Sequence, residues 1–207
     1  VYKKAAENLK NLENNGICKS DEAPCFYVYR QIMNGREQTG LVGCACVDDY
    51  INNNIKKHEL TRADKEADRI RHVDTCDANT GPIFLCYKGQ SEIDNIINEY
   101  KNGAPVYDFV TDDGIANTVW VIDDAAVCEK LSALLSQVGD FYIADGHHRA
   151  ASAVKVGLKR RAENPQYDGT EEFNYFLSVL FADEQLMIMD YNRVVRDLNG
   201  YTPEALV

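Results

Sequence analysis

The stretch FYIADGHHRAASAVKV, residues 141–156, reads as a strand, a tight turn and the start of a helix. Four apolar residues form the strand, Asp145-Gly146 forms the turn, and the small residues that follow allow a helix to pack closely. The helix start carries His147, His148 and Arg149, although the helix dipole favours negative charge at this end. The sequence therefore predicts that an anionic group binds at this turn.

Three interpretations of this turn stay open. In the first, phosphate binds to the N–H groups around Gly146 and the helix start, with Arg149 and the two histidines as further donors. In the second, Asp145 only caps the helix and the histidines are solvated. In the third, a metal ion binds to Asp145, His147 and His148, although adjacent histidines rarely reach one ion. Phosphate is favoured, because without an anion the cations oppose the dipole with nothing gained.

The overall composition narrows the function. The chain has 207 residues, is 45% hydrophobic and carries a net charge of −11, which suits a real core and argues against nucleic-acid or anionic-membrane partners. Its seven cysteines lack CxxC pairs, so we expect no structural metal and a reducing, cytoplasmic location. No apolar run approaches the roughly 20 residues that a membrane span requires.

Hairpins interrupt an alternation of strands and helices along the chain. This order favours an α+β or mixed α/β fold, with a mixed sheet, hairpins and flanking helices. The turn pairs Asn34-Gly35 and Asp113-Gly114 mark the hairpins. The expected elements are a helix over 1–16, a hairpin over 25–47, a helix over 61–73, a strand over 82–87, a helix over 91–103, a hairpin over 106–122, a helix over 123–139, the strand and helix over 141–163, and strands over 172–182 and 186–195.

The two ends of the sequence look cut. The chain opens inside an amphipathic helix without an initiator Met, and it breaks off just after a helix start at Thr202-Pro203. We therefore expect a central fragment of a longer protein that forms one domain, with 1–125 and 126–207 as conceivable sub-parts.

A second group of polar residues lies in the charged segment KKHELTRADKEADRIRH, residues 56–72. Its part over 64–71 reads as a solvated helix with Thr61 as cap. His58 and Glu59 precede this cap on a loop, where a carboxylate beside a histidine makes a credible acid/base pair. The metalloprotease pattern His-Glu-x-x-His is absent from this loop, because Arg62 stands four residues after His58.

Two further motifs are weaker. Asn192 and Arg193 lie near the end of the expected strand over 186–195, where side chains that contact ligands are common. A structural role for them is equally open. Gly40 and Gly43 place two glycines in one strand, where a ligand would approach the backbone or, more commonly, a bulge forms.

Several blocks of the chain together resemble one prokaryotic family, the domain of unknown function 1015. The blocks are YVYRQ, GREQTGLVGC, KHELTRADKEADRIRH, GPIFL, YIADGHHRAASA and DYNRVVRDLNG, in this order, and the resemblance covers essentially the whole chain. Members of this family are longer at both ends, so the resemblance agrees with the expectation that this chain is a central fragment.

More remotely, the DGHHR turn resembles the phosphate-binding turn of ParB/sulfiredoxin-like proteins, and in particular of their free-serine kinases. This resemblance implies a ParB/sulfiredoxin-like element around 141–162, in which Asp145 and Gly146 shape the turn. His147, His148 and Arg149 would then hold the phosphates of a nucleotide. The sulfiredoxin branch carries a reactive cysteine in this turn, and the present chain has no cysteine after Cys128.

These observations lead us to expect a nucleotide-dependent phosphotransferase that acts on a small hydroxyl metabolite, with free L-serine as the first candidate. Mg²⁺ with ATP or ADP is the expected cofactor, with Asp145 as a tentative metal contact. Glu59 is the expected base and His58 the reserve. A substrate carboxylate would bind to Arg62 or Arg193, with Asn192 beside it. A non-catalytic nucleotide sensor and a phosphohydrolase that uses the two histidines are the alternatives.

Overall fold

The tight turn at Asn34-Gly35 organises the centre of the sheet. Both residues adopt left-handed backbone conformations, with φ of 51° and 77°, which suits a two-residue hairpin turn. The turn joins strand β1 (Phe26–Met33) to strand β2 (Arg36–Cys46), and the two strands pair antiparallel. The predicted hairpin is confirmed.

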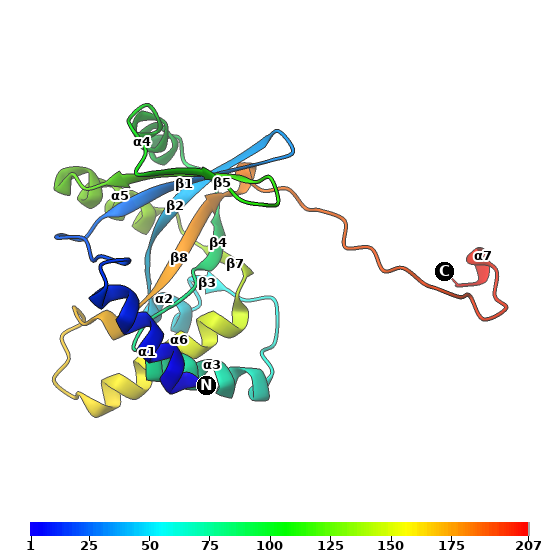
Figure 1. The fold of residues 1–207 in the computed structure, drawn as a ribbon, viewed down its shortest axis with the longest axis horizontal. Helices are drawn as coiled ribbons and strands as arrows, with labels where there is room; N and C mark the ends of the chain where they lie inside the picture. Colours follow the sequence, from blue (N-terminus) through cyan, green and yellow to red (C-terminus); the bar gives the residue numbers. More distant parts are fainter. Residues whose placement is uncertain (207) are drawn as a thin grey trace.

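The computed structural model describes residues 1–206, which form one eight-stranded mixed sheet with helices on both of its sides (Figure 1). The strands lie in the order β3-β7-β4-β8-β2-β1-β6-β5. The β3–β7 and β4–β8 pairs are parallel and the other pairs are antiparallel. The other strands are β3 (Ile55–Lys56), β4 (Ile83–Tyr87), β5 (Tyr107–Val110), β6 (Ala116–Ile122), β7 (Phe141–Asp145) and β8 (Tyr175–Ala182).

The mixed α/β fold with hairpins and flanking helices is therefore confirmed. Strands from both sides of residue 125 alternate in the order of the sheet, so the two conceivable sub-parts share one sheet. The helices are α1 (Tyr2–Asn14), α2 (Val47–Ile51), α3 (Ala63–Cys76), α4 (Ser91–Lys101), α5 (Ala125–Gln137), α6 (His147–Glu163) and α7 (Pro203–Leu206), with 3₁₀ turns η1 (Glu172–Asn174) and η2 (Asp183–Gln185).

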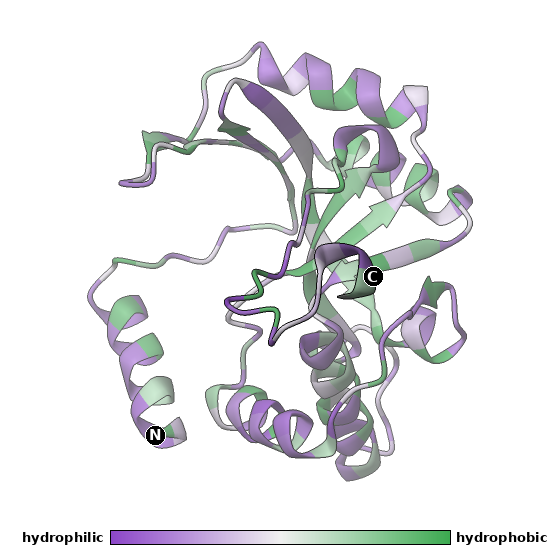
Figure 2. Cartoon of the chain, turned by 90° about the vertical axis from the view of Figure 1, so that its right-hand side faces the viewer, coloured by the Kyte–Doolittle hydropathy of each residue, from purple (hydrophilic) through white to green (hydrophobic). Residues whose placement is uncertain are grey.

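The helices form two groups around the sheet. Helices α4 and α5 pack against each other on one side, where α4 contacts β1 and β6. On the other side α6 contacts β4 and β8, α3 packs on α6, and α1 packs on α3 (Figure 1). The strands are the most apolar part of the molecule, while the helices expose polar faces (Figure 2). Val28, Leu41 and Phe176 are fully buried at the centre of the core. Among residues 1–206, no helix is both long and apolar enough to cross a membrane.

The predicted strand over 186–195 is wrong. A strand needs a neighbour that bonds its backbone groups. Both sides of β8 are already occupied, by β4 and by β2, and beyond η2 the chain leaves the sheet. It runs extended and largely exposed to α7 at the far end of the molecule (Figure 1). The apolar residues of this segment therefore have no partner strand within the described chain.

The cap predicted for α3 is also wrong. The residue at the N-cap position is Arg62, and no side chain caps this helix within the described chain. The Thr61 hydroxyl instead donates a hydrogen bond to Glu66 Oε2 at 2.7 Å. The hydroxyl is therefore used to fix the loop before α3 to the buried face of the helix.

The glycines of β2 serve the packing of the sheet. A Cβ atom on Gly40 would lie 2.4 Å from the Leu180 carbonyl oxygen and 2.7 Å from the Phe181 ring. A Cβ atom on Gly43 would lie 2.7 Å from the ring of Phe26. Neighbouring protein groups, and no ligand, therefore occupy the space above both glycines.

We expect Gly40→Ala to lower the free energy of unfolding by about 1–3 kcal/mol, because the backbone of β8 must move to admit the methyl group. Urea denaturation followed by circular dichroism measures this change. Gly89→Ala is the matched control, since its new Cβ would make only ordinary contacts at 3.6 Å or more. That variant should stay within about 0.5 kcal/mol of the parent. Equal losses in the two variants would contradict this account of Gly40.

Candidate functional site

Three loops meet near one edge of the sheet because of the strand directions. Strand β3 is parallel to β7, so the loops that follow both strands leave at the same end. Strand β4 is antiparallel to β7 and pairs Phe84 with Asp145, so the segment that precedes β4 also lies at this end. Residues 57–62, 79–82 and 145–147 therefore come together although they are distant in sequence.

Gly146 joins strand β7 directly to helix α6. Its φ of 97° lies in the left-handed region, and it occupies the N-cap position of α6. No side chain of residues 1–206 caps the first N–H groups of this helix. Asp145 therefore does not act as the helix cap, contrary to the second interpretation of the turn. The residues that carry these N–H groups line a polar cleft at the end of the sheet.

The Arg149 side chain folds back over the turn. Its Nη2 atom lies 2.6 Å from Asp145 Oδ2, in an ion pair between partly exposed groups. A Cβ atom on Gly146 would lie 2.9 Å from Arg149 Nε, so the side chain packs directly on this glycine. A Cβ atom on Gly81 would lie 3.5 Å from Nη1 of the same arginine. Two glycines thus make room for the guanidinium group.

His147 is buried and lies between His58 and Glu59 of the loop that follows β3. Only 4% of its surface is exposed. Its Nδ1 atom lies 3.5 Å from Glu59 Oε2, and its Nε2 atom faces the backbone N–H of His58 at 3.5 Å. The His58 ring packs edge-on against it, with ring centroids 4.4 Å apart. Since Nε2 faces a donor, the proton of a neutral ring belongs on Nδ1, where it points to the Glu59 carboxylate.

Burial lowers the pKa of His147 below its ordinary value of 6.5, and the nearby His58 lowers it further. The carboxylates of Glu59 and Asp145 act in the opposite direction, so they limit this decrease. His147 is therefore neutral near pH 7. This corrects the expectation that the two histidines bring positive charge to the helix start, because a buried imidazole loses its proton more readily.

His148 contacts Arg62, the residue that leads from the 58–62 loop into α3. Its Nε2 atom accepts a hydrogen bond from the backbone N–H of Arg62 at 3.1 Å, which requires an unprotonated nitrogen. The Arg62 side chain turns away and forms a two-pronged pair with Asp64, at 3.2 and 2.8 Å. The two adjacent histidines therefore fix opposite ends of the 58–62 loop, one at His58 and one at Arg62.

Glu66 is an anchor of this loop that the sequence did not reveal. It is 5% exposed, pairs with Lys155 of α6 and accepts the hydrogen bond of Thr61. The charged segment around it predicts a solvated helix, and only its spacing from Ile70 and Val73 marks a buried face. Glu66 ties α3, α6 and the loop that carries Glu59 together.

These loops and helices enclose a cleft of about 420 Å³. Glu59, Arg69 and His72 line one part of it, and the turn over 145–149 lines another. The third part of the wall comes from residues 79–81 before β4. An open, polar cleft that includes a helix start suits a small anionic ligand.

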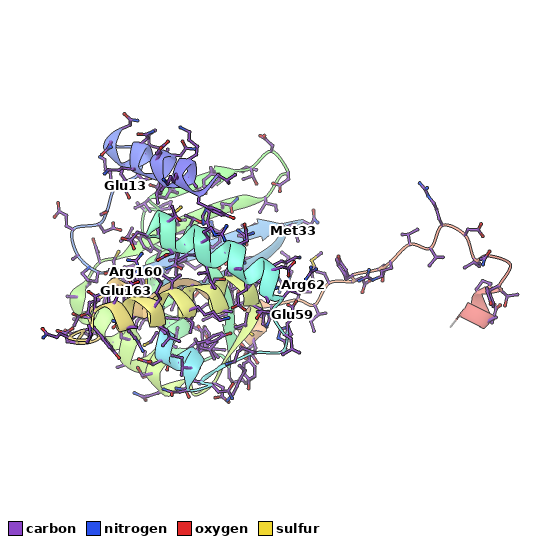
Figure 3. The ribbon with its side chains drawn as sticks, turned by 90° about the horizontal axis from the view of Figure 1, so that it is seen from below. Glu13, Met33, Glu59, Arg62, Arg160 and Glu163 are labelled. Carbon is purple, nitrogen blue, oxygen red and sulfur yellow. The ribbon has the colours of Figure 1, made fainter. Side chains whose placement is uncertain are left out.

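The structure brings most of the predicted site residues together. Glu59 lies in the cleft wall with the whole DGHHR turn, while His58 and Arg62 adjoin it through their backbone N–H groups. Figure 3 shows Glu59 and Arg62 side by side at the start of α3. Asn192 and Arg193 lie on the exposed segment beyond β8 and are not part of this cleft.

The geometry of the turn separates the two histidines. Their rings engage different ends of the 58–62 loop, so they do not converge with Asp145 on one point. Among residues 1–206, no group of three or more His, Cys, Asp or Glu side chains is placed to hold a metal ion. The third interpretation of the turn, a metal ion held by these three residues, therefore finds no support in their arrangement.

Fold and cleft together define a mixed α/β protein with a polar cleft at one end of its sheet. The chain belongs to the family described as a protein of unknown function, DUF1015, whose family model matches residues 1–207. The predicted family is thus confirmed over the whole chain. No curated protein and no solved structure matches the chain. The resemblance of the DGHHR turn to ParB/sulfiredoxin-like proteins stays a prediction.

We expect His147 to titrate below pH 6.5 in the folded protein, and Glu59→Gln to lower its pKa further, since Glu59 favours the protonated ring. Above pH 6.5 the ring is neutral in both states, and as the pH falls below 6.5 the unfolded state binds the proton first, so the stability decreases until the pH reaches the pKa of the folded state. NMR titration of the histidine ring signals measures both effects. Glu129→Gln, an exposed change on α5, should leave the titration unchanged. A pKa above 6.5 would contradict the buried, neutral ring.

We expect Glu66→Gln to cost about 1–2 kcal/mol of stability at pH 7, because it removes the charged hydrogen bonds to Lys155 and Thr61. The bond to Lys155 is the main cause that holds the pKa of Glu66 below its ordinary value of 4.5. The added stability is therefore present above pH 4.5 and is lost as the pH falls through the pKa of the folded state.

Urea denaturation at pH 7 and pH 3 separates this effect from a general loss of packing. The difference in the free energy of unfolding between the parent and Glu66→Gln should be smaller at pH 3, because both side chains are then neutral in the unfolded state. Glu129→Gln should change stability by no more than about 0.5 kcal/mol at either pH. A cost for Glu66→Gln that is the same at both pH values would exclude the charged pair as its source.

Proposed function

We propose that the protein is a nucleotide-dependent phosphotransferase that acts on a small hydroxyl metabolite, with free L-serine as the first candidate substrate. One observation carries this proposal: the uncapped start of α6 opens into a cleft that also contains a guanidinium group and a carboxylate. Phosphoryl transfer requires this combination, because it depends on positioning and charge neutralisation more than on covalent chemistry.

The phosphate groups of the nucleotide would bind to the backbone N–H groups at the start of α6. Free N–H groups and the helix dipole both favour an anion at this point. Arg149 supplies the fixed positive charge and a planar pair of donors for phosphate oxygens. His147 is engaged with the 58–62 loop, so its backbone N–H and not its ring belongs to the phosphate site.

Glu59 is the proposed base. Its carboxylate is half-exposed in the cleft wall and lies beside the Nδ1 atom of His147, which holds it in place. The serine hydroxyl oxygen would attack the terminal phosphorus, the bond from phosphorus to the bridging oxygen would break, and the hydroxyl proton would pass to Glu59. With ATP the products are phosphoserine and ADP. His58, in contact with the His147 ring, is the reserve base.

Asp145 is the carboxylate nearest to the proposed phosphates. Carboxylate oxygens are the protein ligands that Mg²⁺ takes in nucleotide sites, and Asp145 is well exposed beside Arg149. When bound, Mg²⁺ would neutralise phosphate charge. The site therefore suits Mg²⁺ with ATP or ADP, with Asp145 as its one contact from the turn.

The carboxylate of the amino-acid substrate needs a cation in the same cleft. Arg69 of α3 lines the cleft wall, whereas the Arg62 guanidinium is paired with Asp64. We therefore place the substrate carboxylate at Arg69 in preference to Arg62. Asn192 and Arg193 lie outside the cleft and have no part in this proposal. The seven free cysteines suit a cytoplasmic location, where thiols stay reduced.

The proposal is tested by incubation of the protein with Mg²⁺, ATP or ADP, and L-serine, with the products followed by phosphorus NMR. We expect a phosphoserine signal. Arg149→Ala should lower its rate by about 100-fold or more, because the charge that faces the phosphates is lost. Glu59→Gln should lower the rate by about 100-fold while nucleotide binding is retained. Arg196→Ala, an exposed change beyond the sheet, is the matched arginine control.

The other products distinguish the alternatives. Nucleotide hydrolysis that does not depend on serine would favour a phosphohydrolase. Nucleotide binding without any turnover would favour a regulatory protein that senses nucleotide. Failure to bind ATP and ADP at all would exclude the phosphate site at α6 and with it the whole proposal.

A further inference from the structure

A second cavity lies along the same helix pair. It has a volume of about 420 Å³ and is enclosed by the end of α3, the C-terminal half of α6 and the start of β8. Its walls are mixed, with charged residues at one part and an apolar part that includes Val73, Ala78, Ala153, Val156, Phe173 and Leu177. The apolar part suits a flat, uncharged organic group.

The two cavities are neighbours. Val73 and Asn79 line both of them, so a ligand that passes these two side chains would reach from the first cavity into the second. Arg149 lines the first cavity and Gly157 the second, and their separation of eight positions along α6 corresponds to about 12 Å. Figure 3 shows the direction of this axis, with Glu59 and Arg62 at one end of the helix pair and Arg160 at the other.

The charges differ between the two ends. The first cavity contains two arginines, Arg149 and Arg69, and the start of α6, together with the carboxylates of Glu59 and Asp145. In the second, Arg160 is already neutralised by Asp74 at 3.2 Å and Asp77 at 3.0 Å, and Glu172 adds a further negative charge. The second end carries more carboxylates than cations, whereas the first end balances them and adds the helix start, so an anion is favoured at the first end over the second. A ligand that fits both must be anionic at one end and uncharged at the other.

We infer that the second cavity binds the nucleoside end of the nucleotide whose phosphates lie at the start of α6, an inference that rests on the function proposed above. The base would lie between Phe173 and Leu177 on one side and the α6 residues Ala153 and Val156 on the other. Asn79 lies at the junction, where its amide reaches the sugar hydroxyls. The protein then distinguishes a nucleotide from free polyphosphate through this cavity.

Ala78→Phe tests the inference, because it fills the second cavity from a half-buried loop position and leaves the phosphate site intact. Isothermal titration compares the binding of ATP with that of inorganic tripolyphosphate, both with Mg²⁺. We expect the parent to bind ATP more tightly than tripolyphosphate. Ala78→Phe should weaken the binding of ATP by about tenfold or more and leave the binding of tripolyphosphate unchanged. Arg149→Ala should weaken the binding of both ligands. Ala162→Phe, exposed near the end of α6, is the matched control.

Equal affinity of the parent for ATP and tripolyphosphate would overturn the inference, while the phosphate site of the proposed function would stand. If the parent protein binds neither ATP nor tripolyphosphate, both the inference and the proposed function are overturned. Photolabelling of the unmodified protein with 8-azido-ATP supplies a measurement that does not depend on the folding of a variant. The label should attach to the peptide that contains Phe173 and Leu177. Attachment only to peptides outside the second cavity would also overturn the inference.

Discussion

The left-handed backbone of Gly146 is the constraint on which the rest of the site depends. Only a residue without a Cβ atom allows β7 to pass into α6 without a connecting loop while Arg149 lies over the turn. The abrupt passage leaves the first N–H groups of α6 uncapped at the end of the sheet. It also aims two adjacent histidines at different parts of the 58–62 loop. The left-handed φ of Gly146 thus sets where α6 begins, where the Arg149 guanidinium lies and which parts of the 58–62 loop the two histidines contact.

Local signals in the sequence predicted most of the fold. The Asn34-Gly35 turn, the strand–turn–helix at 141–156 and the helix that ends near Glu163 all depend on residues close in sequence, and the structure has each of them. The prediction of a strand over 186–195 was wrong because the apolar run that suggested it is a local pattern, whereas the partner strand that it needs is distant in sequence. The meeting of Glu59 with His147 depends on the parallel pairing of two-residue β3 with β7, which no local pattern announces.

The formal charges of the side chains predicted the site least well, because burial changes which of these side chains are charged and which are exposed to solvent. His147 and His148 look like cations beside Arg149, yet the first is buried with a lowered pKa and the second accepts a backbone hydrogen bond. Glu66 looks like one more solvated carboxylate in a charged helix, yet it is buried and ionised against Lys155. In both cases the decisive quantity is solvent access, which follows from the packing of α3 on α6.

The ion pair between Asp145 and Arg149 has a consequence for any anion that binds at this turn. The Nη2 atom of Arg149 already bonds to Asp145 Oδ2 at 2.6 Å, so an incoming anion that takes this nitrogen must displace the carboxylate. The observed affinity would then be the difference between two charge pairs, and the released carboxylate would become free at the moment the anion arrives. A site of this kind discriminates against monovalent competitors such as chloride, since a ligand displaces the Asp145 carboxylate only when it binds to Arg149 more strongly than this carboxylate does.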